Sequence, residues 1–349
     1  MKLPASMTEI NATWIQHILS IHQPGVIVDD VEHLAVVHGS ATKVRVGITY
    51  RNGTQGSLPP SVMVKIGLEP HSEWVAGMEV YDVEANSYGH VLPQFDFGAP
   101  KCYYQEIQQD PSQVAIVLED LTLRGAEFGD AQRPYTVEQV ISGVQALANI
   151  HAGTWNAPGI ATKWLKPVLT WGEIIPLGGW VEDPDRLLAE PRGFAVPVAL
   201  HNRAKIKEKF HDYCRSVLEG PQCVLHGDAH VGNSFIADGK VNFFDWQCSA
   251  IGHWSHDIGY FMLSALDVPD RRDHEERILR AYLEELQRLG IEPPTFAEAM
   301  AAYKRCMIFC FVMWLGNPVS CQPEQVNLAC FARAGSAIID HGGFDAVLP

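Results

Sequence analysis

The chain has 349 residues, 47% of them apolar and 19% charged, which is enough apolar material for a sizeable core and two structural units. Lys and Arg number 26 against 41 Asp and Glu, so the formal net charge is −15. This charge repels phosphate backbones and anionic lipids, and it argues against nucleic acid and membrane surfaces as partners.

The cysteines and the apolar segments indicate a cytoplasmic protein. The eight cysteines include no Cys-x-x-Cys pair, which is typical of free thiols in a reducing compartment. The most apolar run, at 306–315, is shorter than the ~20 residues that a membrane span requires. The first residues lack the apolar core of a signal peptide, and the Ser6-x-x-Glu9 spacing there predicts a capped helix.

The first third of the chain predicts strands and one helix. Apolar residues alternate with other residues in the first of these strands, the period of a half-exposed antiparallel strand. A helical period follows at 73–91, with Ser72 placed as its N-cap. The strands are expected at 43–50, 61–66, 101–107 and 114–118.

After residue 122 the spacing of the apolar residues becomes that of helices. Thr136 and Gln139 form a capping box, which predicts a helix that runs to His151. Thr295 begins a later helix that is apolar on all sides over 306–315, so we expect it to be buried.

This change of pattern divides the chain. We expect an N-terminal helical extension at 1–21, a strand-rich lobe at 22–117, a hinge at 118–122 and a helical lobe at 123–349. The many Pro, Gly and Trp residues of 156–200 predict an irregular insertion within the helical lobe.

The densest group of polar, reactive side chains begins at His226. Here the sequence reads His-Gly-Asp-Ala-His-Val-Gly-Asn up to Asn233, and an Asp-Trp-Gln sequence follows from Asp245. Between them, Asp238-Gly239 is a favoured two-residue turn, which predicts a hairpin formed by the apolar-rich segments on either side.

The hairpin brings Asn233 and Asp245 close together at its open end. Counting outward from the turn places Asn233 opposite Phe244, and we expect regular pairing to end there, because strict pairing would point the two side chains to opposite faces. An amide oxygen beside a carboxylate suits Mg²⁺. Asp228, on the preceding loop, is near enough to act on a substrate oxygen beside that metal. This is the layout of a phosphoryl-transfer site.

The combined motif, HGDxxxxN followed by DWQ, resembles that of the aminoglycoside phosphotransferase and choline kinase-like superfamily. The DWQ form is most similar to the ecdysteroid-kinase-like branch and related bacterial phosphotransferases. The resemblance extends over 22–320 and implies a protein-kinase-like bilobal α+β fold, with an antiparallel sheet plus one helix in the N-lobe and a mostly helical C-lobe. It also implies transfer of the γ-phosphoryl group of ATP, or GTP, to a hydroxyl of a small molecule, assisted by Mg²⁺.

The resemblance assigns roles within the motif. Asp228 is expected to be the catalytic base, and Asn233 and Asp245 the Mg²⁺ ligands. Asp257, in the segment that follows, is expected to hydrogen-bond the catalytic loop and hold its shape.

Two histidines of the motif have no assigned chemistry. His226 is expected to be a structural core residue that braces the loop. His230 follows Asp228 by two residues and leaves two interpretations open: contact with the substrate or the γ-phosphate, or a loop histidine that faces solvent.

A kinase-like N-lobe requires a strand Lys that pairs with a helix Glu. Lys65 is the one Lys in its strand, and Glu84 borders the apolar stripe of the next helix while Glu79 lies further round, so we expect a Lys65–Glu84 pair. Met63, on the same face of the strand, is expected to face the adenine.

The remaining nucleotide contacts are expected from loops. Gly39 and Ser40, within 38–42, are expected to form the phosphate loop, although this loop has a single glycine. Glu119 and Leu121, at the change of pattern, are expected to offer backbone groups to the adenine edge.

Two other classes of function stay open. The chain could be a metal-dependent phosphohydrolase with a two-metal cluster, although this leaves Lys65 and the strand-rich lobe unexplained. It could also be a nucleotide-binding pseudokinase scaffold, although no residue of the catalytic set is missing. The metal cluster would be drawn from His226, Asp228, His230, Asp245, His253, His256 and Asp257.

The acceptor stays open among aminoglycoside, choline-like, sugar, amino-acid-derived and steroid alcohols. The net charge of −15 mildly suits a cationic acceptor, although most of it is expected to be solvated surface. A small-molecule alcohol is the expected partner, and the oligomeric state is left open.

Overall fold

A computed structural model describes residues 2–70, 72, 79–95, 98–109, 112–156, 164–168, 184–319 and 321–348. The chain forms two compact units. Unit 1 comprises Met1–Gln94 and Ala99–Ala126, and unit 2 comprises Phe95–Gly98 and Glu127–Pro349.

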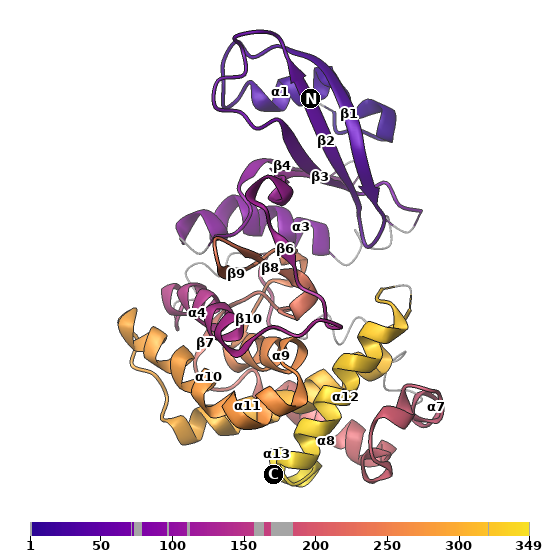
Figure 1. Ribbon diagram of the computed structural model, residues 1–349, viewed down its shortest axis with the longest axis vertical. Helices are drawn as coiled ribbons and strands as arrows, with labels where there is room; N and C mark the ends of the chain where they lie inside the picture. The colour runs from indigo at the N-terminus through magenta and orange to yellow at the C-terminus, as the bar shows by residue number, and fades with distance from the viewer. Residues whose placement is uncertain are drawn as a thin grey trace. The chain divides into compact units, whose positions relative to one another are not determined.

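Unit 1 is built on a five-stranded antiparallel sheet with the strand order β1-β2-β3-β5-β4 (Figure 1). Its strands are β1 (Val28–Val37), β2 (Thr42–Tyr50), β3 (Ser61–Ile66), β4 (Cys102–Gln109) and β5 (Ser112–Glu119). Its helical segments are η1 (Met7–Glu9), α1 (Ala12–Leu19), α3 (Val80–Asn86), η2 (Ser87–Val91), η3 (Leu92–Gln94) and η4 (Leu121–Arg124).

Helix α1 covers one face of this sheet. Alternate residues of the three central strands, among them Val44, Val64 and Val117, share that face and are fully buried. They form one core with α1 residues that include Trp14 and Ile18. The N-terminal segment is therefore part of unit 1 rather than an extension outside it.

The capping box expected at Ser6 and Glu9 is wrong. Met7–Glu9 form a single 3₁₀ turn, and the Ser6 hydroxyl lies 2.9 Å from the Thr8 hydroxyl instead of capping a helix. Helix α1 begins later, where the Asn11 side chain accepts a hydrogen bond from the Trp14 N–H at 3.1 Å.

Unit 2 is mostly helical and has two small antiparallel sheets, β6-β8-β9 and β10-β7. Its strands are β6 (Glu127–Phe128), β7 (Gln222–Leu225), β8 (Ser234–Ala237), β9 (Lys240–Phe243) and β10 (Ala250–His253). Its helices are α4 (Val137–Gly153), α7 (Pro184–Ala189), α8 (Arg203–Ser216), α9 (Ser255–Ala265), α10 (Val268–Arg288), α11 (Phe296–Gly316), α12 (Glu324–Asp340) and α13 (Phe344–Val347). Short 3₁₀ turns are η6 (Gly193–Ala195), η7 (Val198–Leu200), η8 (Val231–Asn233) and η9 (Trp246–Cys248).

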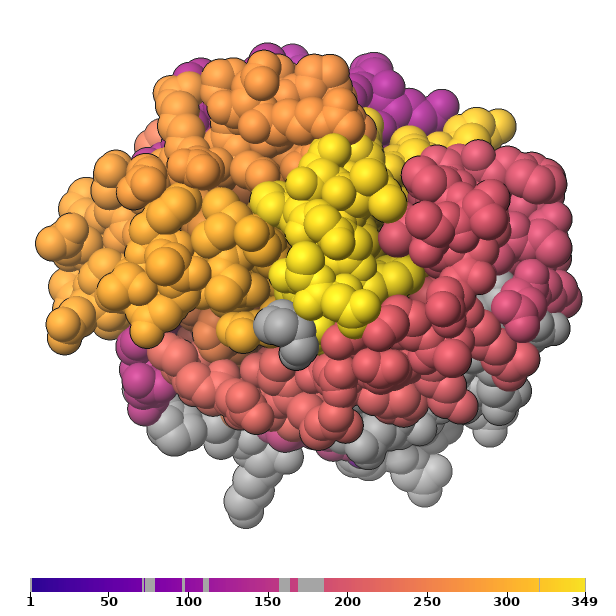
Figure 2. Space-filling model, turned by 90° about the horizontal axis from the view of Figure 1, so that it is seen from below, coloured from indigo at the N-terminus to yellow at the C-terminus, as the bar shows by residue number. Residues whose placement is uncertain are grey.

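The expected helix signals of unit 2 are confirmed. Both reciprocal hydrogen bonds of the capping box are present at Thr136 and again at Thr295. Helix α11 is buried over 306–312, and it packs against α8, α9 and α12. Figure 2 shows the C-terminal segment (yellow) between residues of the 270–300 region (orange) and the segment that holds α7 and α8 (rose).

Helix α11 is also the one helix of the described residues that is long and apolar enough to cross a membrane. However, 67% of its apolar window is buried inside unit 2, which is the behaviour of a core helix.

The antiparallel sheet of unit 1 and the helices of unit 2 confirm the expected α+β fold class. The described part of the expected insertion holds α7, η6 and η7, and Trp171 and Trp180 lie outside the described residues. The expected hinge at 118–122 lies in unit 1, which ends at Ala126.

Candidate functional site

The turn of the hairpin in unit 2 has the geometry that its sequence predicts. Asp238 and Gly239 both have positive φ, 52° and 73°, as the two central residues of a type I′ turn require. Ala237 pairs with Lys240 beside the turn, which sets the register of the whole hairpin.

Regular strand pairing in the hairpin ends just before Asn233 and Asp245. Beyond the end of β9, the Phe244 N–H donates to the Asn233 carbonyl at 3.0 Å. Asp245 then adopts the left-handed conformation, with φ 65° and ψ 63°, which turns the chain out of the strand. A non-glycine residue in this conformation costs roughly 1–3 kcal/mol, and such strain is concentrated at functional sites.

Asn233 orients the carboxylate of Asp228. Its side-chain Nδ2 donates to the Asp228 carbonyl oxygen and to Asp228 Oδ2, both at 2.9 Å. The amide oxygen of Asn233 therefore points away from Asp228 and can accept from, or coordinate to, another group. Tyr260 of α9 also acts to lower the pKa of Asp228, an influence that the sequence pattern did not reveal.

The carboxyl groups of Asp228 and Asp245 interact electrostatically. Burial, and then the charge of Asp245, raise the pKa of Asp228 to about 8, against the opposing hydrogen bond from Asn233. A cation placed at such a pair relieves the repulsion between the two acids. The oxygen donors and the charge of this arrangement therefore fit a divalent cation such as Mg²⁺.

His226 joins the Asp228 loop to the hairpin. Its Nε2 lies 2.9 Å from the Phe244 carbonyl, and its Nδ1 accepts from the Asp228 N–H at 3.2 Å. These partners require the neutral ring with the proton on Nε2, and burial lowers the pKa of His226 in the same sense. The ring also packs on Trp246, with 4.5 Å between centroids.

His230 is buried, so the interpretation of it as a solvent-facing histidine is wrong. Its ring packs against Tyr260 of α9 and Trp314 of α11, and burial lowers its pKa to about 4. Its Nδ1 accepts from the Gly232 N–H at 3.0 Å, and its Nε2 lies 3.8 Å from Asp228 Oδ2. Contact with substrate stays a prediction.

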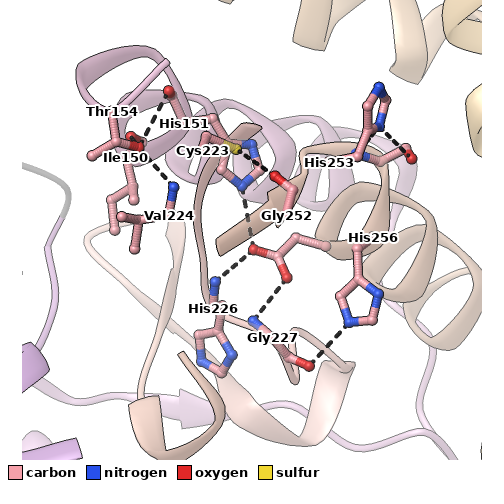
Figure 3. A network of polar contacts seen from close by, with 12 residues as sticks. Ile150, His151, Thr154, Cys223, Val224, His226, Gly227, Gly252, His253 and His256 are labelled. Carbon is pink, nitrogen blue, oxygen red and sulfur yellow. Dashed lines mark hydrogen bonds and ion pairs between the residues drawn. The ribbon is translucent and has the colours of Figure 1, made fainter. Parts of the chain in front are cut away.

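Asp257 holds the backbone of the loop at His226 and Gly227, two of the residues labelled in Figure 3. It is fully buried, and it accepts from the backbone N–H groups of His226 at 2.7 Å and Gly227 at 2.9 Å. This is the hydrogen bonding that the resemblance implies. Burial alone would raise the pKa of Asp257, but the hydrogen bond from His151, 3.2 Å away, holds it below its usual value.

Gly227 allows the loop to pass close to its neighbour. Its φ is +81°, and a Cβ at this position would lie 1.9 Å from the carbonyl oxygen of Cys248. Only glycine fits here.

In unit 1, the structure pairs Lys65 with Glu84. Lys65 Nζ lies 2.5 Å from Glu84 Oε2, and both side chains are buried. Glu79 lies just before α3 and is exposed, so it is Glu84 that takes this position.

Lys65 shares its sheet face with further charged groups. Lys43 is its direct neighbour on β2, and Arg45 lies opposite half-buried Met63. Arg45 Nε donates to Asp120 at 2.6 Å. The sequence pattern predicted neither Lys43 nor Asp120 as a residue of this site. The segment around Asp120 was expected to contribute only backbone groups.

The backbone groups of Glu119 and Leu121 are partly used inside unit 1. The Glu119 N–H donates to the Lys101 carbonyl at 2.8 Å, so this N–H is already used, and contact of the Glu119 backbone with adenine stays a prediction. The Leu121 carbonyl accepts from the Ala126 N–H at 3.2 Å, so Leu121 could offer its N–H.

The segment expected to bind phosphates connects β1 to β2. Gly39 lies close to Lys43, whose Nζ would be 3.6 Å from a Cβ on the glycine. The Ser40 carbonyl accepts from the Tyr81 hydroxyl of α3.

The geometry argues against the two-metal cluster of a phosphohydrolase. Among the described residues, no group of three or more His, Cys, Asp or Glu side chains is placed to hold a metal ion. His226 and His256 already use both ring nitrogens, and those of His256 lie 2.8 Å from the Tyr213 hydroxyl and 3.1 Å from the Gly227 carbonyl.

Two family models match the sequence. Residues 120–291 match the phosphotransferase enzyme family, and residues 40–157 match the ecdysteroid kinase-like family. The first match includes the Asp228 loop and the hairpin, and the second includes Lys65 and Glu84. No curated protein matches the sequence.

Several solved structures share the fold at low sequence identity. A choline kinase from Cryptosporidium parvum Iowa II is 12% identical over 97% of this chain and 98% of its own, with a TM-score of 0.53. The choline kinase LicA from Streptococcus pneumoniae, in complex with AMP, is 14% identical over 97% and 100%, with a TM-score of 0.51. A microcompartment-associated aminopropanol kinase is 12% identical over 97% and 99%, also with a TM-score of 0.51. At these identities the likeness shows the fold alone.

Proposed function

We propose that the chain is a member of the aminoglycoside phosphotransferase and choline kinase-like superfamily, as the two family models support. Its proposed reaction is transfer of the γ-phosphoryl group of ATP, or GTP, to a hydroxyl of a small molecule with Mg²⁺. The observation that carries this proposal is the arrangement of side chains at the open end of the hairpin. Asn233 orients Asp228 from one side, and the charge of Asp245 acts on the same carboxyl group.

Asp228 is the proposed base. It accepts a hydrogen bond from the attacking hydroxyl and takes its proton late, because the transition state of phosphoryl transfer is loose and little proton abstraction is needed before it. The hydrogen bonds from Asn233, together with the two backbone bonds that Asp257 makes to the loop, hold the carboxylate in one orientation. Such positioning supplies most of the catalysis in this class of reaction.

The oxygen of the Asn233 amide and the carboxylate of Asp245 are the proposed Mg²⁺ ligands. When bound, the ion neutralises charge on the β- and γ-phosphates. The left-handed backbone of Asp245 supports this assignment, because such backbone strain is concentrated at functional sites.

Unit 1 is proposed to bind the nucleotide. Lys65 contacts the phosphates, and Glu84 fixes the position of its ammonium group. The AMP bound in the choline kinase LicA structure from Streptococcus pneumoniae, which shares this fold, supports an adenine nucleotide.

The test is an ATP-depletion screen with Mg²⁺ across aminoglycoside, choline-like, sugar, amino-acid-derived and steroid alcohols. We expect ADP formation that depends on at least one acceptor. Asp228→Asn should lower that rate about 10²–10⁴-fold, the usual share of a positioned base, and leave nucleotide binding nearly intact.

Two results would contradict the proposal. ATP binding with background turnover for every acceptor would indicate a pseudokinase scaffold. A tightly bound transition metal without affinity for ATP would indicate a phosphohydrolase.

A further inference from the structure

The segment 38–42, which we call the phosphate loop, is fixed to its surroundings in unit 1 by side chains rather than shaped by glycines. It contains Gly39 alone, whose φ is not in the left-handed region. A loop that binds phosphates through its backbone must become ordered when the ligand binds, unless other contacts have already ordered it. This ordering costs conformational entropy. Contacts that order it beforehand therefore favour nucleotide binding.

One buried carboxylate joins the two ends of this loop. Glu69 Oε1 accepts from the Thr42 hydroxyl at 2.7 Å and lies 2.9 Å from Nδ1 of His38. The Glu69 side chain is 9% exposed and Thr42 is buried, so water competes little for the Thr42 contact. The Glu69 N–H donates to the Ser72 hydroxyl at 2.9 Å, which fixes the backbone that carries this carboxylate.

Helix α3 holds the middle of the loop. The buried Tyr81 donates its hydroxyl proton to the Ser40 carbonyl. Glu84, one turn later on the same helix, pairs with Lys65. The loop and the candidate phosphate-binding lysine are therefore positioned by one helix.

A carboxylate beside a phosphate loop is electrostatically unfavourable for binding a polyphosphate. Its presence is explained if its hydrogen bonds contribute more by ordering the loop than its charge costs. The two effects have opposite signs when the carboxylate is removed, so they can be separated by experiment.

We propose that Glu69 is a positioning residue for nucleotide binding, which braces the phosphate loop at Thr42 and His38. This inference rests on the proposed function, because it takes the loop to contact the nucleotide phosphates.

The first test compares Thr42→Val, which keeps the shape but loses the hydroxyl, with Thr42→Ser, which keeps the hydroxyl. We expect Thr42→Val to raise the KM for ATP about tenfold, the factor that loss of one hydrogen bond to a charged group supplies. The KM for the acceptor should stay unchanged, and Thr42→Ser should restore the wild-type KM for ATP. A purely structural role would instead lower the melting temperature without this split between the two KM values.

The second test uses the sign of the effect of Glu69→Ala. Bracing predicts a higher KM for ATP, whereas a bystander carboxylate predicts a lower one, because its repulsion is removed. A lower or unchanged KM would overturn the inference. If Glu69→Ala does not fold, the Thr42 pair and Tyr81→Phe, which releases the Ser40 carbonyl, decide the question through the same two KM values.

The control is Asp29→Asn, at an exposed ion pair with Arg51 elsewhere in unit 1, which should change neither KM. Wild-type protein that fails to bind ATP in a titration would overturn the proposed function. Wild-type protein that binds ATP, with unchanged affinity in Thr42→Val, would overturn only the role of Glu69.

Discussion

At the scale of single residues, Asp245 combines a strained backbone with a charge. Its left-handed conformation is one that Asn tolerates better than Ala, so two substitutions separate the backbone from the carboxylate.

We expect Asp245→Asn to fold like the wild type and to lose Mg²⁺-dependent nucleotide binding, because the amide keeps the conformation but not the charge. Asp245→Ala should lose the same binding and about 1 kcal/mol of stability as well. Calorimetric titration of ATP with and without Mg²⁺, together with denaturant unfolding, measures both effects. Unchanged Mg²⁺-dependent affinity in Asp245→Asn would contradict the ligand role.

At Gly227, the energetic cost of a left-handed backbone can be separated from the cost of a steric clash. Gly227 and Gly239 have similar φ values, +81° and +73°, but a Cβ would lie 1.9 Å from the Cys248 carbonyl at the first and meet nothing within 4 Å at the second. Gly239→Ala should therefore cost about 1 kcal/mol, and Gly227→Ala more than about 3 kcal/mol with loss of activity. Equal costs in denaturant unfolding would show that the Cys248 contact relaxes without penalty.

At the scale of elements, α1 is a structural part of the sheet of unit 1. Ile18 and Ile21 allow a matched test, because they are the same residue type three positions apart, one fully buried and the other 62% exposed.

We expect Ile18→Ala to cost about 2–5 kcal/mol, through lost burial and the cavity left on the sheet, and Ile21→Ala to cost less than about 0.5 kcal/mol. Equilibrium unfolding of both variants measures the difference. If Ile18→Ala matched Ile21→Ala, α1 would be packed on the sheet without stabilising it.

Elements that depend on neighbouring residues could be predicted from the sequence. The hairpin followed from Asp238-Gly239 and a count of residues, and the helix starts at Thr136 and Thr295 followed from reciprocal capping. Local signals also compete, which is why the helix expected at Ser6 begins at Asn11 instead.

Polar pairs distant in the chain could not be predicted in this way. His151 and Asp257 are 106 residues apart, and Arg45 and Asp120 are 75 residues apart. The period of a helix or strand shows which face a side chain occupies, but not which polar group of another element will meet it. The Lys65–Glu84 pair could be predicted only because the family resemblance requires such a pair.

At the scale of the whole molecule, an ionic cluster in unit 2 links stability to pH. Arg271 of α10 donates to Glu275 at 2.9 Å and to Asp340 of α12. Tyr303 of α11 donates to Glu275 at 3.2 Å, and His341 lies 2.8 Å from it. Burial alone would raise the pKa of Glu275, but His341 and Arg271 lower it below its ordinary value.

A carboxyl group with a lowered pKa stabilises the fold at a pH above its unfolded value, about 4.3 for Glu, and this contribution is lost as the pH falls through the folded value. Glu275→Gln should therefore cost about 3 kcal/mol at pH 7, where Arg271 loses a buried partner, and less at pH 3, where wild-type Glu275 is itself becoming protonated. Glu276→Gln, whose side chain is 69% exposed and 3.9 Å from Arg280, should change stability by less than about 0.5 kcal/mol at either pH. Urea unfolding of the three proteins from pH 3 to 7 measures these differences. A Glu275→Gln deficit that is the same at every pH would mean that the loss comes from packing and not from the charge of Glu275.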